Sequence, residues 1–243
     1  MICLKNNTHF LPRALADCDS NPNKGSKAAW TKKLSDRYSS VPVLTEQLPE
    51  GWTPDAVMVD AMFTINTTPL KHTQNISAYA TTLLYRFVVP YFKRGTKEVH
   101  MVFDHPGRHN FNPKECEQRR RDDSHKQKEH HTHIQFTQQT SIPNPWREYL
   151  QCHECKCSLI EAIGLSYLQT ARCKLQSGQQ LILAGCFSGT AEDTAWKITA
   201  DDLLPQPEPI YRSCAQEAHM RVWRHAINSQ AHNILIYSPD TNV

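Results

Sequence analysis

Three short apolar segments of the chain are each followed closely by an aspartate, and this recurrence restricts the possible folds most strongly. The segments cover residues 56–59, 98–103 and 233–237, and the aspartates that follow them are Asp60, Asp104 and Asp240. Apolar runs of this length that contain valine or isoleucine are typical of buried strands. Each acid is therefore expected at or just beyond the carboxyl end of a strand.

A helical pattern separates the first two of these segments. Apolar side chains recur at intervals of three and four over residues 75–93, and Pro90 and Gly95 mark the far end of this predicted helix. A strand, a helix and a second strand in this order predict a right-handed crossover with parallel pairing. We therefore expect an α/β protein, a three-layer α/β/α fold around a mainly parallel sheet, with Asp60 and Asp104 at one edge.

The second half of the chain adds two helical patterns and another strand. Residues 146–176 show helical spacing, and residues 179–187 are predicted to contain a strand. Ser213 followed by Gln216 fits a capping box, which predicts that a helix begins at Ser213. Glu217 falls near the first turn of this helix. The packing stripe of the helix consists of Ala218, Val222 and Ala226.

The chain is expected to have one main domain. Residues 1–50 are rich in polar side chains and predict a poorly ordered extension, whereas residues 51–243 carry all the strand and helix patterns described above. A histidine-rich stretch at about residues 122–145 predicts a polar loop. The chain ends shortly after Asp240, so we expect a fragment whose domain is incomplete at its C-terminus.

Composition limits the compartment and the partners. The nine cysteines are an odd number, and no hydrophobic signal segment precedes them, so reduced thiols and an intracellular protein are expected. No apolar run is long enough to cross a bilayer. Cys152, Cys155 and Cys157 form half of a zinc motif without a second half, so partly buried helix thiols are the favoured interpretation. A formal net charge of +3 permits a nucleic-acid partner without requiring one.

The acids at the strand ends predict a metal site. Parallel sheets place ligand sites at the carboxyl edge, where Asp60, Asp104 and Asp240 would meet, with Glu217 leaning over them. Several carboxylates in one pocket repel each other unless cations neutralise them. Oxygen ligands of this kind suit one or two Mg²⁺ or Mn²⁺ ions, which activate water for phosphodiester hydrolysis. The alternative is that these aspartates only cap helices.

A basic segment follows the second predicted strand. It covers residues 114–128 and includes Lys114, Arg119 and Arg120. As a helix it would be polar on almost every side, and such a run is usually a solvated face. Beside an acidic edge it instead suggests contacts to phosphates.

Together these motifs resemble the PIN-like nuclease superfamily, and most of all its flap endonuclease and XPG-type branch. The motifs are Val59-Asp60-Ala61-Met62-Phe63, Val102 to Gly107 with the arginine run Arg119 to Arg121, Gln216-Glu217-Ala218-His219, and Ser238 to Val243. They occur in the family's order and span roughly residues 56–243. The resemblance implies a three-layer domain that cleaves DNA or RNA with metal ions, often at branched or single-stranded junctions, and a nuclear location.

The resemblance also implies roles for individual residues. Asp60 and Asp104 match metal-ligand aspartates, Glu217 matches the first acid of a helix pair, and Asp240 matches the first acid of an Asp-x-Asp pair. The residues that match the family's phosphate-contacting helix are Lys114, Arg119 and Arg120.

Two departures from the family pattern bear on activity. His219 and Asn242 stand where the family has the second acid of each pair, so a second metal ion would lose much of its charge balance. This favours an alternative in which the domain keeps its fold, binds nucleic acid or protein, and does not catalyse. A third alternative is a small Rossmann-like binding protein, although the chain has no Gly-x-Gly-x-x-Gly loop after its first strand.

Overall fold

We describe the protein from a computed structural model. The structure describes residues 51–68, 74–107, 134–143, 146–215 and 217–238, all of which belong to one compact unit, Glu50–Val243. The predicted extension at residues 1–50 and the basic segment at 114–128 lie outside the described residues. None of the described helices is both long and apolar enough to cross a membrane.

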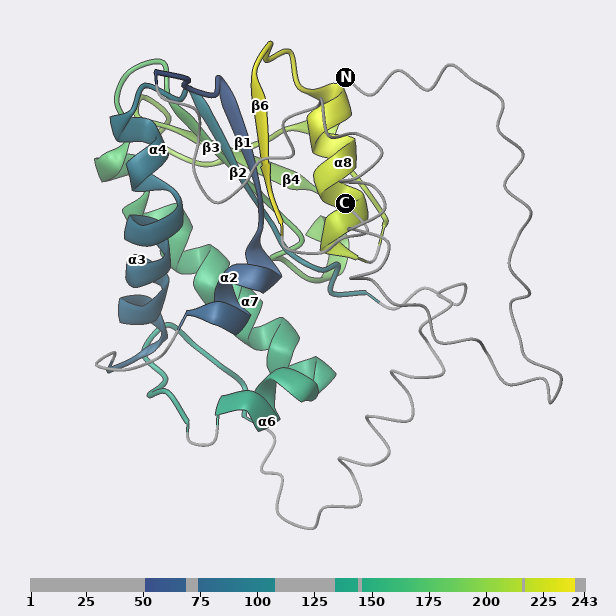
Figure 1. Cartoon of the computed structure of the whole chain (residues 1–243). Coiled ribbons are helices and arrows are strands. Elements are labelled where there is room, and N and C mark those ends of the chain that lie inside the picture. Colours follow the sequence, from purple (N-terminus) through teal and green to yellow (C-terminus); the bar gives the residue numbers. More distant parts are fainter. Residues whose placement is uncertain (1–50, 69–73, 108–133, 144–145, 216, 239–243) are drawn as a thin grey trace, which may run out of the picture. The chain divides into compact units, whose positions relative to one another are not determined.

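A six-stranded sheet forms the centre of this unit, in the order β5-β4-β3-β2-β1-β6 (Figure 1). The strands are β1 (Ala56–Asp60), β2 (Glu98–Val102), β3 (Gln180–Ala184), β4 (Ala195–Thr199), β5 (Gln206–Pro207) and β6 (Ile234–Tyr237). The pairs that β1 makes with β2 and β6 are parallel, as is the pair of β2 with β3. β4 runs antiparallel to both β3 and β5. The prediction of a mainly parallel α/β sheet is thus confirmed.

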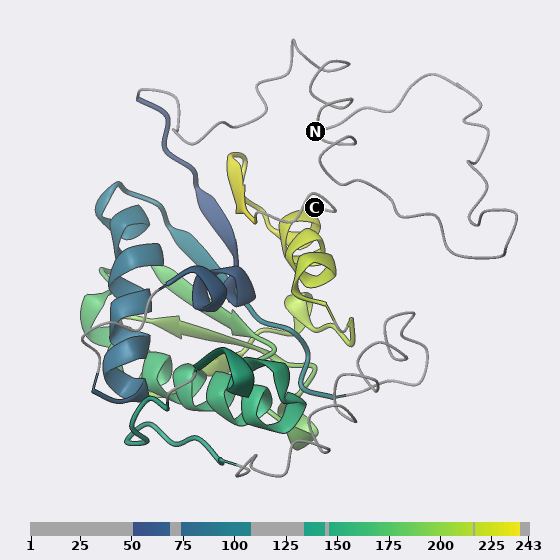
Figure 2. The ribbon, with the colours of Figure 1, turned by 60° about the horizontal axis from the view of Figure 1, so that its bottom comes forward.

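Helices cover both faces of the sheet. They are α2 (Ala61–Thr67), α3 (Ile76–Phe87), α4 (Val89–Lys93), α6 (Trp146–Gln151), α7 (His153–Thr170) and α8 (Ala218–Asn228), with short 3-10 turns η1 (Arg172–Lys174), η2 (Gly189–Ala191) and η3 (Pro209–Tyr211). α3 and α7 lie side by side against one face, and α8 lies on the opposite face (Figure 2). This arrangement is compatible with three α/β/α layers.

The alternation of side chains along the strands explains why the interior is apolar on both faces. Met58 of β1 and Val102 of β2 pack against Val222 of α8, and the partly buried Ala226 joins this cluster. The neighbouring residues on each strand point the other way, as the pleat requires. Every residue of β1 is buried, which is typical of a parallel strand with helices on both sides.

The predicted helix over residues 75–93 is in fact two helices, and proline explains the break. Asn75 caps α3, because its side chain accepts a hydrogen bond of 2.9 Å from the backbone N–H of Ala78. Pro90 has no backbone N–H and is excluded from a helix interior. It lies instead in the first turn of α4, where that donor is not needed.

Other boundaries also differ from the predictions. The single helix expected over 146–176 is divided at Cys152, whose backbone is extended, into α6 and α7. The capping-box prediction is wrong, because α8 begins at Ala218 and the hydroxyl of Ser213 instead accepts a hydrogen bond from Ala215 in a turn. α2, β4 and β5 were not predicted, since each is short and lacks a clear apolar period.

Candidate functional site

The carboxyl edge of the sheet brings the first two predicted acids together. Asp60 is the last residue of β1, and Asp104 lies two residues beyond the end of β2, the parallel neighbour of β1. Burial raises the pKa of Asp60 above its usual value, and the negative charge of Asp104 raises it further. The two carboxylates are thus close enough to repel each other.

Asp60 is held from two sides. One carboxylate oxygen accepts a 3.2 Å hydrogen bond from the backbone N–H of Phe63 and caps α2. The other accepts a 3.3 Å hydrogen bond from the hydroxyl of Ser238, which directly follows β6. Asp60 therefore connects the ends of two neighbouring strands, β1 and β6. The helix-cap alternative describes part of its role correctly.

Asp104 contacts the first turns of two helices, α7 and α8. Its Oδ2 lies 2.9 Å from Nζ of Lys156, in the first turn of α7. Its Oδ1 accepts a hydrogen bond of 3.0 Å from the backbone N–H of Ala218, the first residue of α8. A carboxylate at a helix N-terminus is favourable because the helix dipole and the unpaired N–H groups meet it there.

Glu217 lies at the same edge through this contact. It is the N-terminal flanking residue of α8, and the next residue, Ala218, donates to Asp104. The carboxylate of Glu217 lies 3.0 Å from Nδ1 of His219. The side chain at position 219 therefore pairs with the acid beside it, instead of adding a second negative charge.

The structure does not test the other predicted site residues. Asp240 and Asn242 lie outside the described residues. So do the predicted phosphate-contacting residues Lys114, Arg119 and Arg120. Within the part of the chain that is described, no group of three or more His, Cys, Asp or Glu side chains is placed to hold a metal ion.

The cysteine motif has the features of structural thiols. Cys155 is buried in α7, whereas Cys152 and Cys157 are half-buried, and none of the three is in a disulfide bond. Burial raises the pKa of Cys155 to about 11, so its thiol stays protonated at neutral pH. Zinc binds the thiolate form of cysteine. The favoured interpretation of partly buried helix thiols agrees with this geometry.

Two cations at the edge were not recognised in the sequence. Lys156 lies within the cysteine motif, and its sequence position gives no signal of a contact with Asp104. Arg221 is fully buried in α8, and none of its guanidinium nitrogens has a hydrogen-bond partner among the described residues. Burial lowers the pKa of Arg221, while the thiol of Cys186 and the carboxylates of Asp193 and Asp104 favour its charge. The available signal was an arginine at helical spacing with the apolar residues Ala218 and Val222.

A buried histidine connects the loop after β2 to the loop after β3. Nε2 of His105 lies 2.9 Å from a carboxylate oxygen of Asp193, and Nδ1 accepts a 2.9 Å hydrogen bond from the backbone N–H of Gly107. Nε2 must therefore carry the proton that is donated to Asp193. This contact places Asp193 close to the edge.

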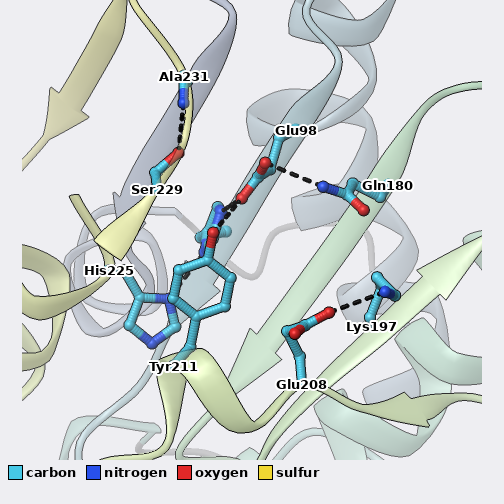
Figure 3. Close-up of polar contacts among 9 residues, drawn as sticks. Glu98, Gln180, Lys197, Glu208, Tyr211, His225, Ser229 and Ala231 are labelled. Carbon is cyan, nitrogen blue, oxygen red and sulfur yellow. Dashed lines mark hydrogen bonds and ion pairs between the residues drawn. The ribbon is translucent and has the colours of Figure 1, made fainter. Parts of the chain in front are cut away.

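A second polar cluster lies toward the opposite end of β2, beneath α8. Glu98 accepts hydrogen bonds from the hydroxyl of Tyr211 at 2.8 Å, from the side-chain amide of Gln180 at 2.9 Å, and from His100 (Figure 3). Nδ1 of His100 lies 2.7 Å from Nδ1 of His225, and both rings are fully buried. The ring of Tyr211 stacks on His225 with centroids 4.7 Å apart.

The hydrogen bonds of this cluster define one neutral arrangement. If His100 donates from Nε2 to Glu98, its Nδ1 must accept the proton of His225 Nδ1. Nε2 of His225 then carries a lone pair, and this is the atom that has no partner among the described residues. Burial lowers the pKa of both histidines, and for His225 the charges of His100, Arg221 and Arg224 lower it further.

Comparison with other proteins adds no relative. No protein-family model matches the chain, and neither the curated proteins nor the solved structures compared with it give a significant match. The class that the fold defines is therefore an α/β domain with strand-end acids at one edge, and any narrower family remains a proposal.

Proposed function

We propose that this chain is a PIN-like nuclease domain, of the flap endonuclease and XPG-type branch, that hydrolyses phosphodiester bonds of DNA or RNA with one or two Mg²⁺ or Mn²⁺ ions. The observation that supports this most is the meeting of Asp60 and Asp104 at the carboxyl ends of two parallel strands. Glu217 is brought to the same edge by the hydrogen bond between Ala218 and Asp104. Open α/β sheets use this edge for ligands.

The acids at the edge supply the type of donor atom that a hard cation prefers. Carboxylate oxygens are the ligands that Mg²⁺ and Mn²⁺ prefer. Asp60 and Asp104 would hold the ion, together with Glu217 and Asp240 as the resemblance implies. A bound divalent ion supplies an activated water and neutralises charge on the leaving oxygen.

Other residues of the chain orient the acids at the edge. The hydrogen bonds from Phe63 and Ser238 fix the carboxylate of Asp60, which is buried. The basic residues Lys114, Arg119 and Arg120 are proposed to position the phosphate, and branched or single-stranded substrates are the proposed partners.

A second candidate is a catalytically inactive domain that binds nucleic acid or protein. The pairing of Glu217 with His219 and of Asp104 with Lys156 favours it, because these protein groups already contact acids that a catalytic metal would need.

Cleavage assays separate the two candidates. Purified protein is incubated with flap, single-stranded and duplex substrates in Mn²⁺, and Asp60→Asn is expected to lower the cleavage rate by at least about 100-fold, since it removes one ligand charge. Asp55→Asn is the matched control, because Asp55 precedes the opposite end of β1 and accepts a hydrogen bond from the backbone of Asn233. Equal cleavage by Asp60→Asn and wild type would refute the catalytic proposal. Binding without cleavage by the wild type would favour the inactive domain.

A further inference from the structure

The ion pair between Lys156 and Asp104 differs from a second, similar ion pair of the protein in the groups that surround the acid. Lys197 and Glu208 form an ion pair of 2.8 Å on β4 and the segment before η3 (Figure 3). The two pairs are alike in length, at 2.9 and 2.8 Å, and in exposure, with side chains that are 23% and 30% accessible in one and 30% and 23% in the other. They differ in what surrounds the acid.

Asp104 is fixed on both of its oxygens. The backbone N–H of Ala218 holds Oδ1, so Oδ2 is the oxygen that lies against Lys156. Asp60 is close enough for the charge of Asp104 to affect its pKa. Lys156 is therefore a cation placed against a carboxylate that a neighbouring carboxylate repels. In the second pair the acid is Glu208, which has no predicted role in metal binding.

The position of Lys156 is set by the helix that carries it. Its backbone N–H donates to the carbonyl oxygen of Cys152 at 2.9 Å, in the first turn of α7. The packing of α7 against α3, with Leu159 and Ile163 fully buried, fixes this turn relative to the sheet. The ammonium group thus remains near Asp104 at a high effective concentration, because it is tethered and cannot diffuse away.

We infer that Lys156 is a resident cation that competes with a divalent metal ion for Asp104 and thereby sets the metal affinity of the edge. This inference rests on the proposed function, because Asp104 is a ligand only if that proposal holds. A metal ion must displace Nζ from Oδ2 and then lies next to a positive charge, and both effects weaken binding. The ligands concerned are hard divalent cations, Mg²⁺ and Mn²⁺.

The test is calorimetric titration of the full chain with Mn²⁺ at constant pH and ionic strength. Lys156→Gln is expected to bind Mn²⁺ at least about tenfold more tightly than wild type, because the competitor and its charge are removed. Lys197→Gln, which breaks the matched ion pair, is expected to bind with wild-type affinity. Adding Asp104→Asn to Lys156→Gln is expected to abolish the gain. Lys156→Met replaces Lys156→Gln if the latter does not fold.

The outcomes distinguish the inference from the proposed function. Metal binding by wild type with unchanged affinity in Lys156→Gln overturns the inference and leaves the function standing. Binding by Lys156→Gln alone supports the inference and shows that the wild-type edge is not a metal site, which contradicts the proposed function. No binding by either protein overturns both. An equal gain in Lys197→Gln also overturns the inference, because the effect would then be one of net charge.

Discussion

Stability should fall with acidification because of the buried histidine pair, and His225→Leu should remove part of this dependence. His100 and His225 share one proton between their Nδ1 atoms, at 2.7 Å. A second proton has no room there, and a proton on Nε2 of His225 would place a charge in a fully buried site that has no partner among the described residues. Both histidines therefore stay neutral in the folded protein at a pH where they are protonated in the unfolded chain.

The sign and size follow from linkage. The folded pKa values of both histidines are lowered, so the unfolded state binds more protons as the pH falls below about 6.5, and the free energy of unfolding decreases. A histidine that stays neutral when folded contributes a loss of about 1.4 kcal/mol between pH 7.5 and pH 5.5. The pair should thus account for up to about 3 kcal/mol, and His225→Leu should remove at least half of it.

Other charged groups surround the pair and must be considered. Glu98 of β2 bonds to His100, and although burial opposes its charge, the bonds from His100, Tyr211 and Gln180 hold its pKa below the usual value. Glu208 acts on His100 from the segment before η3, and Arg221 and Arg224 act on His225 from α8. The arginines oppose protonation of His225, whereas the acids favour protonation of His100, so the larger share of the effect is expected from His225.

Urea denaturation at pH 7.5, 6.5 and 5.5 measures the effect. His225→Leu is expected to be less stable than wild type at pH 7.5, because Nδ1 of His100 loses its partner, but to lose less stability on acidification. His232→Gln is the control, since His232 is exposed just beyond α8 and its replacement should keep the wild-type dependence. Parallel curves for wild type and His225→Leu would refute the reasoning.

Two further predictions concern the turn beneath the edge and the buried arginine. Gly185 has φ +80°, and an added Cβ would lie 2.5 Å from the carbonyl oxygen of Phe103, so Gly185→Ala is expected to lower the free energy of unfolding by about 2 to 5 kcal/mol. Gly178→Ala, with φ +81° and no atom within 4 Å, should cost only about 1 to 2 kcal/mol, and equal losses in urea denaturation would contradict the steric argument. Arg221→Met is expected to raise the free energy of unfolding by about 1 kcal/mol or more, because it removes a buried guanidinium group that has no hydrogen-bond partner among the described residues. A lower thermal midpoint for Arg221→Met would show that the guanidinium is stabilising.

The amino-acid sequence by itself determined four of the six described strands and the order of the acids. Burial on both faces demands short apolar runs, and this requirement is local, so β1, β2, β3 and β6 could all be predicted from their residues. Parallel pairing followed from the length of the connection between the first two strands. The meeting of Asp60 and Asp104 at one edge was then a consequence of topology, and the structure confirms it.

Only the tertiary structure decided which groups those acids meet. Asp104 pairs with Lys156, which lies 52 positions away in the sequence. It also accepts a hydrogen bond from Ala218, which lies 114 positions away. Ala218 is the first residue of α8, and no local motif indicated that this helix begins there. The two buried histidines are 125 positions apart. Such polar contacts depend on distance and orientation between separate elements, and the hydrophobic period of a single segment contains no information about either.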